Sequence, residues 1–405
     1  MIDEQKQSNT FRSAFMLLVM LFFMWGFITS LNDILIPHLK SVFELSYTEA
    51  MLIQFCFFGS YFAMSMPASL IIDKFGYTKG IVTGLVVMGF GALLFYPASV
   101  IVFYPLFLFA LFILASGITI LQVAANPFVA AVGDPRTASS RLNLSQGFNS
   151  LAHTIAPIFG TYLILHDPGE SLANSAEAVQ LPYIGLAVSL FLLALFFSRI
   201  SLPSIQKAES SSSIETGSIW NHKQLTFGVI AIFLYVGIEV SIGGFLVNFF
   251  GEPDIANMPE KIAGNYVSYY WGGAMVGRFV GSALLQKIKA ERLLAIAAIG
   301  ALTLVLITIM TTGHMAMWAI LLVGLCNSVM FPNIFTLSIS GLGKQTSRGS
   351  GLLVMAIVGG AIVPLIQGLL ADSFGVQISF SVGFLCYGYI LFYALRGYRL
   401  KEAII

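Results

Sequence analysis

The sequence predicts an all-α integral membrane protein with twelve transmembrane helices in two pseudo-symmetric six-helix halves. Composition is the first observation behind this class, and apolar runs and a weak internal repeat are the others. Of the 405 residues, 57% are hydrophobic and only 10% are charged, whereas soluble domains carry about 25% charged residues. A chain this apolar could not keep a soluble surface. Its net charge of +1 gives no reason to expect a nucleic-acid partner.

Apolar runs of spanning length recur along the whole chain, each near the roughly 20 residues that a helix needs to cross the hydrocarbon. Each run must be helical, because lipid cannot satisfy free backbone groups. We place the spans at 14–38, 49–72, 79–98, 102–132, 140–165, 181–199, 224–250, 264–286, 291–311, 315–341, 347–371 and 376–396.

The basic residues set the orientation of these spans. With the N-terminus in the cytoplasm, all 20 Lys and Arg residues except Lys40 and Lys261 fall on the cytoplasmic side, and Arg278 is among them. This is the distribution that the positive-inside rule requires. We therefore expect a multi-pass protein of a bacterial inner membrane, surrounded by lipid, monomeric, and with both termini in the cytoplasm.

A polar stretch near the middle of the chain, 201–223, contains four consecutive serines and predicts a cytoplasmic linker. It separates an N-terminal half, 1–200, from a C-terminal half, 224–405. The halves echo one another, since at an offset of 207 residues Arg141 meets Arg348 and Pro157 meets Pro364. Such a duplication of six plus six spans is typical of major facilitator transporters.

The turn "DKFGYTK" (73–79) between spans two and three resembles the signature that this superfamily carries there. Asp73, Lys74 and Gly76 are expected to form a charged turn against the helix ends that holds a gate in one of two states. A merely solvated turn is the alternative.

Two carboxylates lie deep inside apolar runs, Asp33 in span one and Glu239 in span seven. A charge at the bilayer centre costs at least about 2.5–3.5 kcal/mol, so such groups usually face a cavity and bind something. Both acids are in the first span of their half, and we expect both to face a central cavity. Asn32 lies beside Asp33, and the pair is expected to couple transport to a cation, with Glu239 as a second coupling group. Satisfaction by a neighbouring tyrosine or backbone amide is the alternative.

Uncharged polar residues interrupt several other spans. Amides both donate and accept hydrogen bonds, and a flat aromatic ring packs against the C–H face of a pyranose, so the combination suits a ligand covered in hydroxyls. Helix–helix contacts made by amides are the alternative. Asn126–Pro127 is also expected to break its helix and to free carbonyls for the cavity. The predicted substrate-binding residues are Gln54, Gln122, Asn126, Gln146, Asn149, Asn248, Tyr270 and Trp271.

Several stretches, "WGFITSLNDILIPHLK", "LFILASGITILQVAANPFV", "RLNLSQGFNS" and "YVSYYWGGAMVGRFVGS" among them, resemble the fucose–galactose–glucose permease family of the major facilitators. The resemblance covers nearly the whole chain and implies sugar uptake coupled to an inward cation. It implies that Asp33 of "LND" is the coupling carboxylate and that Asn149 of "QGFNS" lies where the family contacts sugar. Gln122 departs from the family's fucose permeases, which carry an acid there. "VGIEVSIGGFLVNFF" resembles the glucose/galactose branch.

The sequence therefore predicts a secondary transporter that imports a hexose of the glucose or galactose type by alternating access, without a cofactor. The co-transported cation is Na⁺ or H⁺. Asn32 and the missing acid at Gln122 favour sodium, which Asp33 would then ligate with nearby amide and backbone oxygens. Proton-coupled uptake of fucose or N-acetylglucosamine, or drug efflux by an antiporter, are the alternatives. No nucleophile with a base, metal cluster or phosphate-binding loop appears in the sequence to indicate an enzyme.

Overall fold

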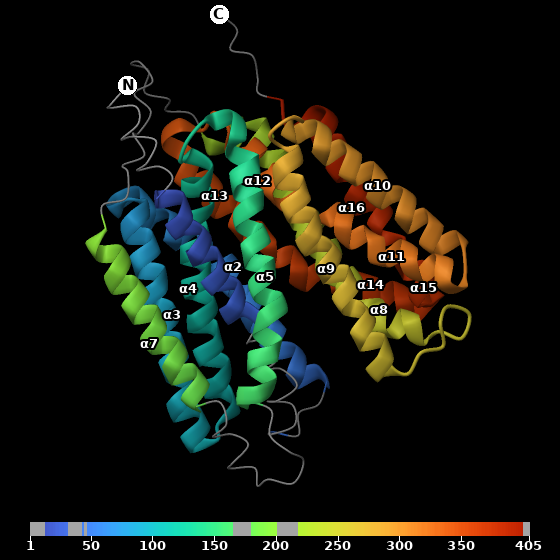
Figure 1. Ribbon diagram of the computed structural model, residues 1–405, viewed down its shortest axis with the longest axis horizontal. Coiled ribbons are helices and arrows are strands. Elements are labelled where there is room, and N and C mark those ends of the chain that lie inside the picture. The colour runs from blue at the N-terminus through green and yellow to red at the C-terminus, as the bar shows by residue number, and fades with distance from the viewer. Residues whose placement is uncertain (1–12, 31–42, 44–46, 165–179, 201–217, 400–405) are drawn as a thin grey trace, which may run out of the picture. The chain divides into compact units, whose positions relative to one another are not determined.

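The computed structural model describes residues 13–30, 43, 47–164, 180–200 and 218–399 (Figure 1). A first helix covers Ser13–Ser30. The other long helices of the N-terminal half are α2 (Tyr47–Phe75), α3 (Tyr77–Ile101), α4 (Tyr104–Ala131), α5 (Ala138–Ile164) and α7 (Gln180–Arg199). Those of the C-terminal half are α8 (Lys223–Gly251), α9 (Glu260–Leu284), α10 (Ala290–Met310), α11 (Gly313–Asn327), α12 (Met330–Ile339), α13 (Thr346–Met355), α14 (Gly359–Phe374), α15 (Val376–Ser379) and α16 (Val382–Phe392).

The helices follow the predicted spans in order. Within the described residues, 10 helical segments are long and apolar enough to cross a membrane. Helices α5 and α9, with 27 and 25 residues, are also long enough to span but are interrupted by more polar side chains. These 10 segments together with α5 and α9 correspond to the twelve predicted spans.

Contacts within the chain divide it into two compact units. The first comprises Met1–Val132, Phe148–Gln206 and Ser350–Met355, and the second comprises Gly133–Gly147, Lys207–Gly349 and Ala356–Ile405. Each unit therefore consists mainly of one half of the sequence and takes in a short segment of the other half. Residues 201–217 of the predicted linker, 201–223, lie outside the described residues.

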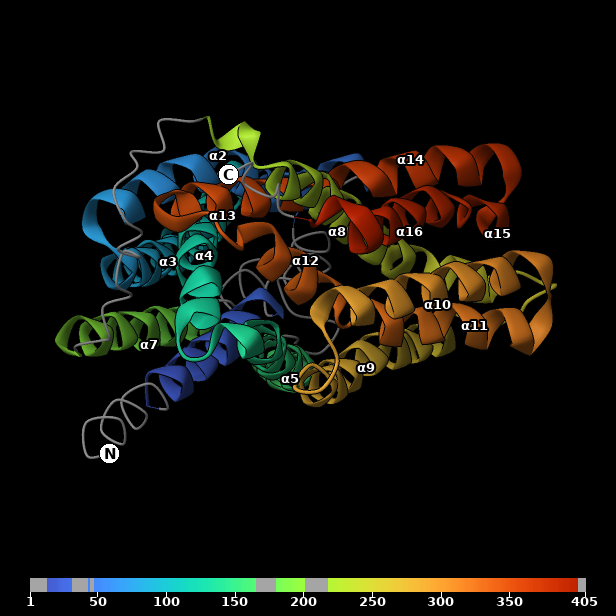
Figure 2. The same cartoon turned by 90° about the horizontal axis from the view of Figure 1, so that it is seen from above.

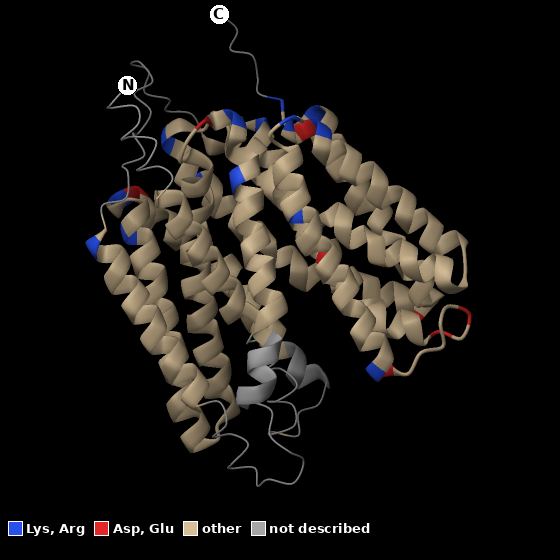
Figure 3. Ribbon diagram, viewed as in Figure 1, with Lys and Arg blue, Asp and Glu red and all other residues tan. Residues whose placement is uncertain are grey.

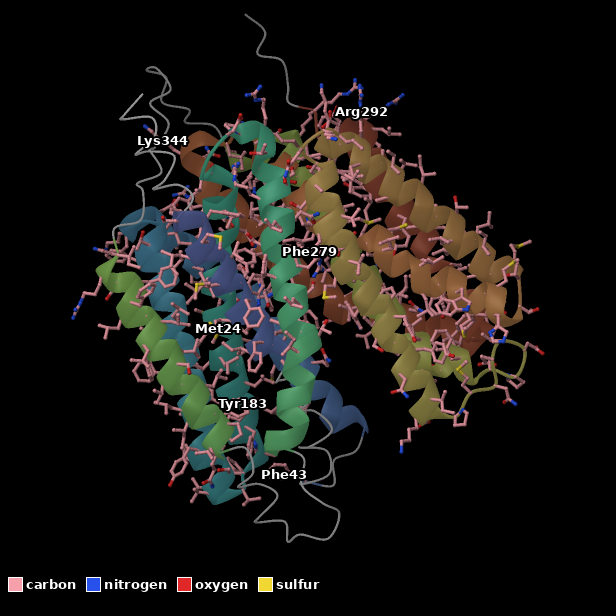
Figure 4. The ribbon with its side chains drawn as sticks, in the orientation of Figure 1. Met24, Phe43, Tyr183, Phe279, Arg292 and Lys344 are labelled. Carbon is pink, nitrogen blue, oxygen red and sulfur yellow. The ribbon has the colours of Figure 1, made fainter. Side chains whose placement is uncertain are left out.

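In the first unit, α3 packs against both α4 and α7, and α2 packs against α4. Tyr183 of α7, labelled in Figure 4, stacks on Phe95 of α3 with ring centroids 4.1 Å apart. Helices α3 and α4 approach closely at Gly84, where an added Cβ would lie 2.9 Å from the carbonyl oxygen of Gly117. Small residues at such crossings let membrane helices pack tightly without a hydrophobic driving force between them.

In the second unit, α8 packs against α14, α12, α16 and α9, while α10 packs against α11 and α16. Figure 2 shows α9, α10 and α11 on one side of this bundle and α14, α15 and α16 on the other. Helix α8 contacts members of both groups, so its residues are well placed to form a polar centre for the unit.

Two predicted spans of the C-terminal half are not continuous helices. The run 315–341 is divided at Ser328 and Val329 into α11 and α12, and the run 347–371 is divided by a 3₁₀ turn at Ala356–Val358 into α13 and α14. A helix break leaves carbonyls without their intrahelical partners. The carbonyl of Asn327, at the end of α11, accepts a hydrogen bond from the Tyr235 hydroxyl at 3.1 Å.

The predicted break at Asn126–Pro127 is wrong. Helix α4 runs from Tyr104 through Pro127 to Ala131. A proline inside a helix removes the N–H that would bond the carbonyl four residues earlier, which here belongs to Val123. Ser350 donates its hydroxyl to that carbonyl oxygen at 3.0 Å, inside the first unit. The freed carbonyl is therefore satisfied by a side chain and does not need a cavity.

Charged residues gather at helix ends and in loops, as Figure 3 shows. In the second unit, most Lys and Arg residues lie at one end of the bundle, and the acidic residues of the loop after α8 lie at the other end. Arg278 departs from the sequence interpretation, which counted it among the cytoplasmic charges. It lies inside α9, with a side chain only 14% exposed, and it faces a carboxylate of α8.

Candidate functional site

Several of the predicted substrate-binding amides belong to the first unit, where α4 and α2 bring two of the polar residues into contact. The Gln122 amide donates to the Tyr61 hydroxyl at 2.8 Å. Gln122 is 3% exposed and Tyr61 is 3% exposed, so this bond lies in the interior of the unit. A buried amide whose donor is fixed still presents its carbonyl oxygen as an acceptor.

Asn149 of α5 is held against the first helix. Its amide donates to the carbonyl oxygen of Phe22 at 2.9 Å. Gly26 makes this approach possible, because an added Cβ there would fall on the backbone and side chain of Asn149. One turn away, Trp25 is buried and packs on Phe22 with ring centroids 5.1 Å apart. Phe22 of the first helix therefore binds the Asn149 amide through its carbonyl and contacts the Trp25 indole through its ring.

Asn126 has no hydrogen-bond partner for either amide atom in the described part of the chain, although it is fully buried. An unsatisfied buried amide costs about 1–3 kcal/mol, so it requires an explanation such as a ligand or a partner in another state. Gln146, 7% exposed, lies on the same helix as Asn149. Gln54 is half-buried in α2. Asp33 and Asn32, the predicted coupling residues, lie outside the described residues.

The second unit contains a network of tyrosines around Asn327. The Asn327 amide donates to the Tyr270 hydroxyl at 2.8 Å, and its carbonyl oxygen accepts from the Tyr387 hydroxyl at 2.9 Å. The Tyr270 hydroxyl in turn donates to the backbone oxygen of Glu239 at 3.1 Å. Tyr270 is therefore fully buried with its hydroxyl occupied in both directions. Its geometry indicates that it positions neighbouring residues.

Glu239 lies beside this network and faces Arg278. One guanidinium nitrogen is 3.7 Å from a carboxylate oxygen, and the two side chains are 14% and 11% exposed. The predicted coupling carboxylate therefore has a permanent cation beside it in this structure. Removing one partner of a buried pair would leave an uncompensated charge.

Trp271 follows Tyr270 on α9 and is 42% exposed. Its ring lies at 77° to the Tyr270 ring with centroids 5.1 Å apart. It also lies over Gly243 of α8, where an added Cβ would come within 2.9 Å of the indole. Asn248, nine residues after Glu239 on the same helix, is exposed. Trp271 and Asn248 thus keep accessible surface, whereas Tyr270 does not.

Sequence reasoning predicted neither the pairing of Arg278 with Glu239 nor the network that joins Asn327 to Tyr387. Arg278 was counted as a cytoplasmic charge together with most of the other basic residues. The tyrosine network depends on contacts between α8, α9, α11 and α16, which no local pattern reveals. The one feature of the sequence that pointed to these polar contacts is the unusual polarity of the stretch that forms α9.

The predicted gating turn joins α2 to α3. Gly76 lies at a φ of 86°, a left-handed conformation that favours glycine, and its N–H donates to Ile72 O at 2.8 Å. Gly375 ends α14 in the same manner at a φ of 88°, after the similar sequence "DSFG". Lys74 places its ammonium 5.2 Å from the Phe75 ring centroid. Asp73 and Lys74 are exposed, and their role in a gate stays a prediction.

A metal-binding cluster of three or more His, Cys, Asp or Glu side chains does not occur among the described residues. The sodium site expected at Asp33 lies outside them. What the described residues do offer is a set of buried amides in one unit and an ion pair beside an accessible indole in the other. These are groups that bind a polar, uncharged ligand by hydrogen bonds.

Comparisons with known proteins show which family this fold belongs to. The model of the Major Facilitator Superfamily matches residues 15–363. A glucose/galactose transporter of Brucella abortus is 53% identical over 396 residues, covering 97% of this chain and 96% of that protein. The L-fucose-proton symporter of Escherichia coli is 34% identical over 411 residues, covering 96% and 94%. The crystal structure of the major facilitator FucP in the outward conformation matches with a TM-score of 0.86 at 33% identity, over 95% of this chain and 98% of that one.

The fold and the polar residues inside it thus define a multi-pass helical membrane transporter, not an enzyme. The chain belongs to the Major Facilitator Superfamily and, within it, to the fucose–galactose–glucose permease family.

Proposed function

We propose that this protein imports a hexose of the glucose or galactose type by symport with a cation, through alternating access of its two halves. The observation that carries the proposal is the 53% identity to a glucose/galactose transporter over 97% of the chain. The buried amides Gln122, Gln146 and Asn149 support it, because amides that can donate and accept suit the hydroxyl groups of a sugar. Asn126 supports it as well, since its amide is buried without a partner among the described residues.

Fucose is the competing substrate, because two relatives named L-fucose-proton symporter are 34% and 29% identical. Gln122 favours glucose or galactose, which carry a full set of hydroxyl groups, over fucose. Its amide supplies an uncharged donor and an uncharged acceptor for those groups. N-acetylglucosamine and drug efflux have no observation in the described residues that favours them.

Asp33 is the proposed coupling residue. Neutralising it before the site closes would require a cation, and each inward elementary charge gains about 2.3 kcal/mol per 100 mV of membrane potential. Two arguments bear on the identity of the cation. Asn32 and the amide at Gln122 favour sodium, whereas the names of the fucose symporters favour a proton.

Uptake into proteoliposomes tests the proposal. Purified protein is reconstituted, and accumulation of radiolabelled glucose, galactose and fucose is measured under an imposed sodium gradient at equal pH, then under an imposed pH gradient without sodium. We expect concentrative uptake of glucose or galactose under one of the two gradients. Accumulation of fucose alone, or of no sugar under either gradient, would contradict the proposed function.

Asp33→Asn separates coupling from binding. We expect this variant to lose accumulation while it still exchanges labelled for unlabelled hexose across the membrane. Accumulation against a gradient by Asp33→Asn would remove the coupling role from this residue.

The same proposal places the protein in a bacterial inner membrane as a monomer, with both termini in the cytoplasm. Cysteine labelling of cells, first intact and then with a permeable membrane, tests the orientation. A cysteine introduced at the exposed position Lys287 is expected to react only after the membrane is made permeable, and one at Lys261 is expected to react in intact cells.

A further inference from the structure

The contact between Glu239 and Arg278 is incomplete as a hydrogen-bonded pair. The separation of 3.7 Å between nitrogen and oxygen lies within ion-pair range but beyond the 2.7–3.2 Å of an ordinary N–H···O hydrogen bond. One carboxylate oxygen of Glu239 accepts no hydrogen bond from the described residues. Tyr235 supplies a hydrogen bond to the same side chain. The oxygen that accepts none, in a carboxylate whose charge is balanced by Arg278, can accept a hydrogen bond from a ligand.

Helix α9 shows that this pair faces away from lipid. One accessible face carries Ile262, Tyr269, Val276 and Val280, which are 48%, 58%, 51% and 51% exposed. This face carries three aliphatic side chains and one tyrosine and suits contact with acyl chains.

A second side of α9 carries Gly264, Ser268 and Trp271, which are exposed, followed by Met275 and Arg278, which are partly buried, at steps of three and four residues. Residues at these spacings share one side of a helix. At 100° per residue the two faces are separated by more than a quarter of the helix circumference. Trp271 and Arg278 therefore lie on one side of α9, distinct from the exposed apolar side.

Helix α8 provides the opposite side of the same contact. Glu239 and Gly243 are four residues apart on α8, and Arg278 and Trp271 are seven apart on α9. Arg278 meets Glu239 and Trp271 meets Gly243, so the ion pair and the indole lie at successive levels of one helix–helix contact. The absence of a side chain at Gly243 leaves the room that the indole occupies.

We propose that Arg278 and Glu239 bind the hydroxyl groups of the transported hexose, as a fixed donor and acceptor beside the Trp271 indole. A sugar diol can accept from a guanidinium and donate to a carboxylate at once, and hydrogen bonds to charged groups are about twice as strong as those between neutral groups. The pair is neutral overall, so it needs no additional cation to enter a closed site. Glu239 is then a sugar-binding residue, and coupling rests with Asp33. This inference rests on the proposed function.

Asn327 and Tyr270 act as positioning residues in this arrangement. Asn327 fixes the Tyr270 hydroxyl, which also binds the backbone of Glu239, and the Tyr270 ring packs against Trp271. The network thus holds the acid and the indole at a constant separation.

The test replaces the pair without leaving a buried charge. Glu239→Met with Arg278→Met removes both charges while keeping similar volume, a change that is often neutral or stabilising for buried ion pairs. We expect the double variant to match the wild type in thermal unfolding and to lose affinity, with the KM for hexose in counterflow exchange raised about tenfold or more. Counterflow is used because it reports sugar binding and carrier movement without cation coupling.

The control removes an exposed Asp–Arg ion pair in the turn that joins α4 to α5. Asp134 and Arg136 form a contact of 2.8 Å between α4 and α5, with side chains 44% and 89% exposed. Asp134→Asn with Arg136→Gln is expected to leave the KM unchanged.

A wild-type KM in the double methionine variant would overturn the inference. So would Glu239→Gln retaining a wild-type KM in exchange while losing accumulation, since that result assigns Glu239 to coupling. If the double variant does not fold, Glu239→Asp keeps the charge and withdraws the carboxylate by one methylene, and an unchanged KM there overturns the inference equally. Failure of the wild-type protein to transport any hexose would instead contradict the proposed function.

Discussion

The Ser350 hydroxyl donates to the backbone oxygen of Val123 at 3.0 Å, although 227 residues separate them in the sequence. Pro127 lies four residues after Val123 and supplies no N–H to that oxygen. The serine therefore satisfies a carbonyl that would otherwise be buried without a partner. Ser350 belongs to the short segment Ser350–Met355 that joins the first unit, so the proline of α4 creates the attachment point for a segment of the C-terminal half.

A double-mutant cycle tests this relationship. Ser350→Ala is expected to lower the free energy of unfolding by about 1–3 kcal/mol, because it leaves a buried acceptor unsatisfied. Pro127→Ala restores the intrahelical N–H, so Ser350→Ala should cost much less in that background. Thermal or chemical unfolding in detergent measures all four proteins. Equal costs of Ser350→Ala in both backgrounds would show that the serine and the freed carbonyl are not coupled.

Gln122 is expected to influence affinity for sugar as well as stability. Its donor is fixed by Tyr61, which leaves the amide oxygen oriented for a ligand. Gln122→Ala should raise the KM for hexose about tenfold through loss of a buried hydrogen bond, as measured by counterflow in proteoliposomes.

Gln367 offers a matched control for that experiment. It is also a fully buried glutamine, and it is bonded to Ser241 at 2.5 Å and to Ser379 at 3.2 Å. Gln367→Ala should lower stability and leave the KM unchanged. If both variants shift the KM equally, the effect of Gln122 reflects general loosening of the protein.

The approach of the first helix to α5 depends on Gly26. Gly26→Ala should prevent this approach, because the new Cβ would fall on the backbone of Asn149. We expect lower stability and reduced transport, read from the unfolding temperature and from uptake. Gly59→Ala in α2 is the comparison, since nothing lies within 4 Å of its added Cβ. That change should stabilise by up to about 1 kcal/mol, the helix propensity of alanine over glycine. Equal tolerance of both changes would contradict the close contact.

The order of the helices could be predicted from hydropathy and length because lipid imposes both on a spanning segment. The stretches that form α5 and α9 were also recognisable, although polar side chains interrupt them. The continuity of α4 could not be predicted, since the group that compensates for Pro127 comes from Ser350, far along the chain. Judged from the sequence alone, a proline within a helix predicts that the helix breaks there.

Residue types at the candidate site could be predicted, but their partners could not. An acid inside an apolar run indicates a functional or paired carboxylate, and the sequence left both readings open for Glu239. The partner of Glu239 is Arg278, and the two residues meet only because α8 packs against α9. Tyr270 was predicted to bind sugar, yet its hydroxyl is fully engaged by Asn327 and by the backbone of Glu239. Aromatic composition cannot distinguish a ring that contacts ligand from one that positions its neighbour.

Asn126 and Asn333 occupy equivalent positions of the two halves, at the same offset of 207 residues that relates Arg141 to Arg348. Both are fully buried, and neither amide has a hydrogen-bond partner among the described residues. Leucine has the same branched shape as asparagine without the polar atoms. Asn126→Leu and Asn333→Leu should therefore each raise the free energy of unfolding by about 1–2 kcal/mol, by removing an unsatisfied amide.

Measurements of hexose transport should distinguish Asn126→Leu from Asn333→Leu. Asn126 is a predicted sugar ligand beside Gln122 on α4, so Asn126→Leu should gain stability and lose affinity for hexose in counterflow. Asn333 is not among the predicted substrate-binding residues, so Asn333→Leu should gain stability at an unchanged KM. Natural proteins retain an unfavourable buried group where function requires it, and opposite changes in stability and affinity are the signature of that case. A gain in stability at unchanged KM for both variants would remove Asn126 from the sugar site, and a loss of stability in either would show that its amide has a partner in the membrane.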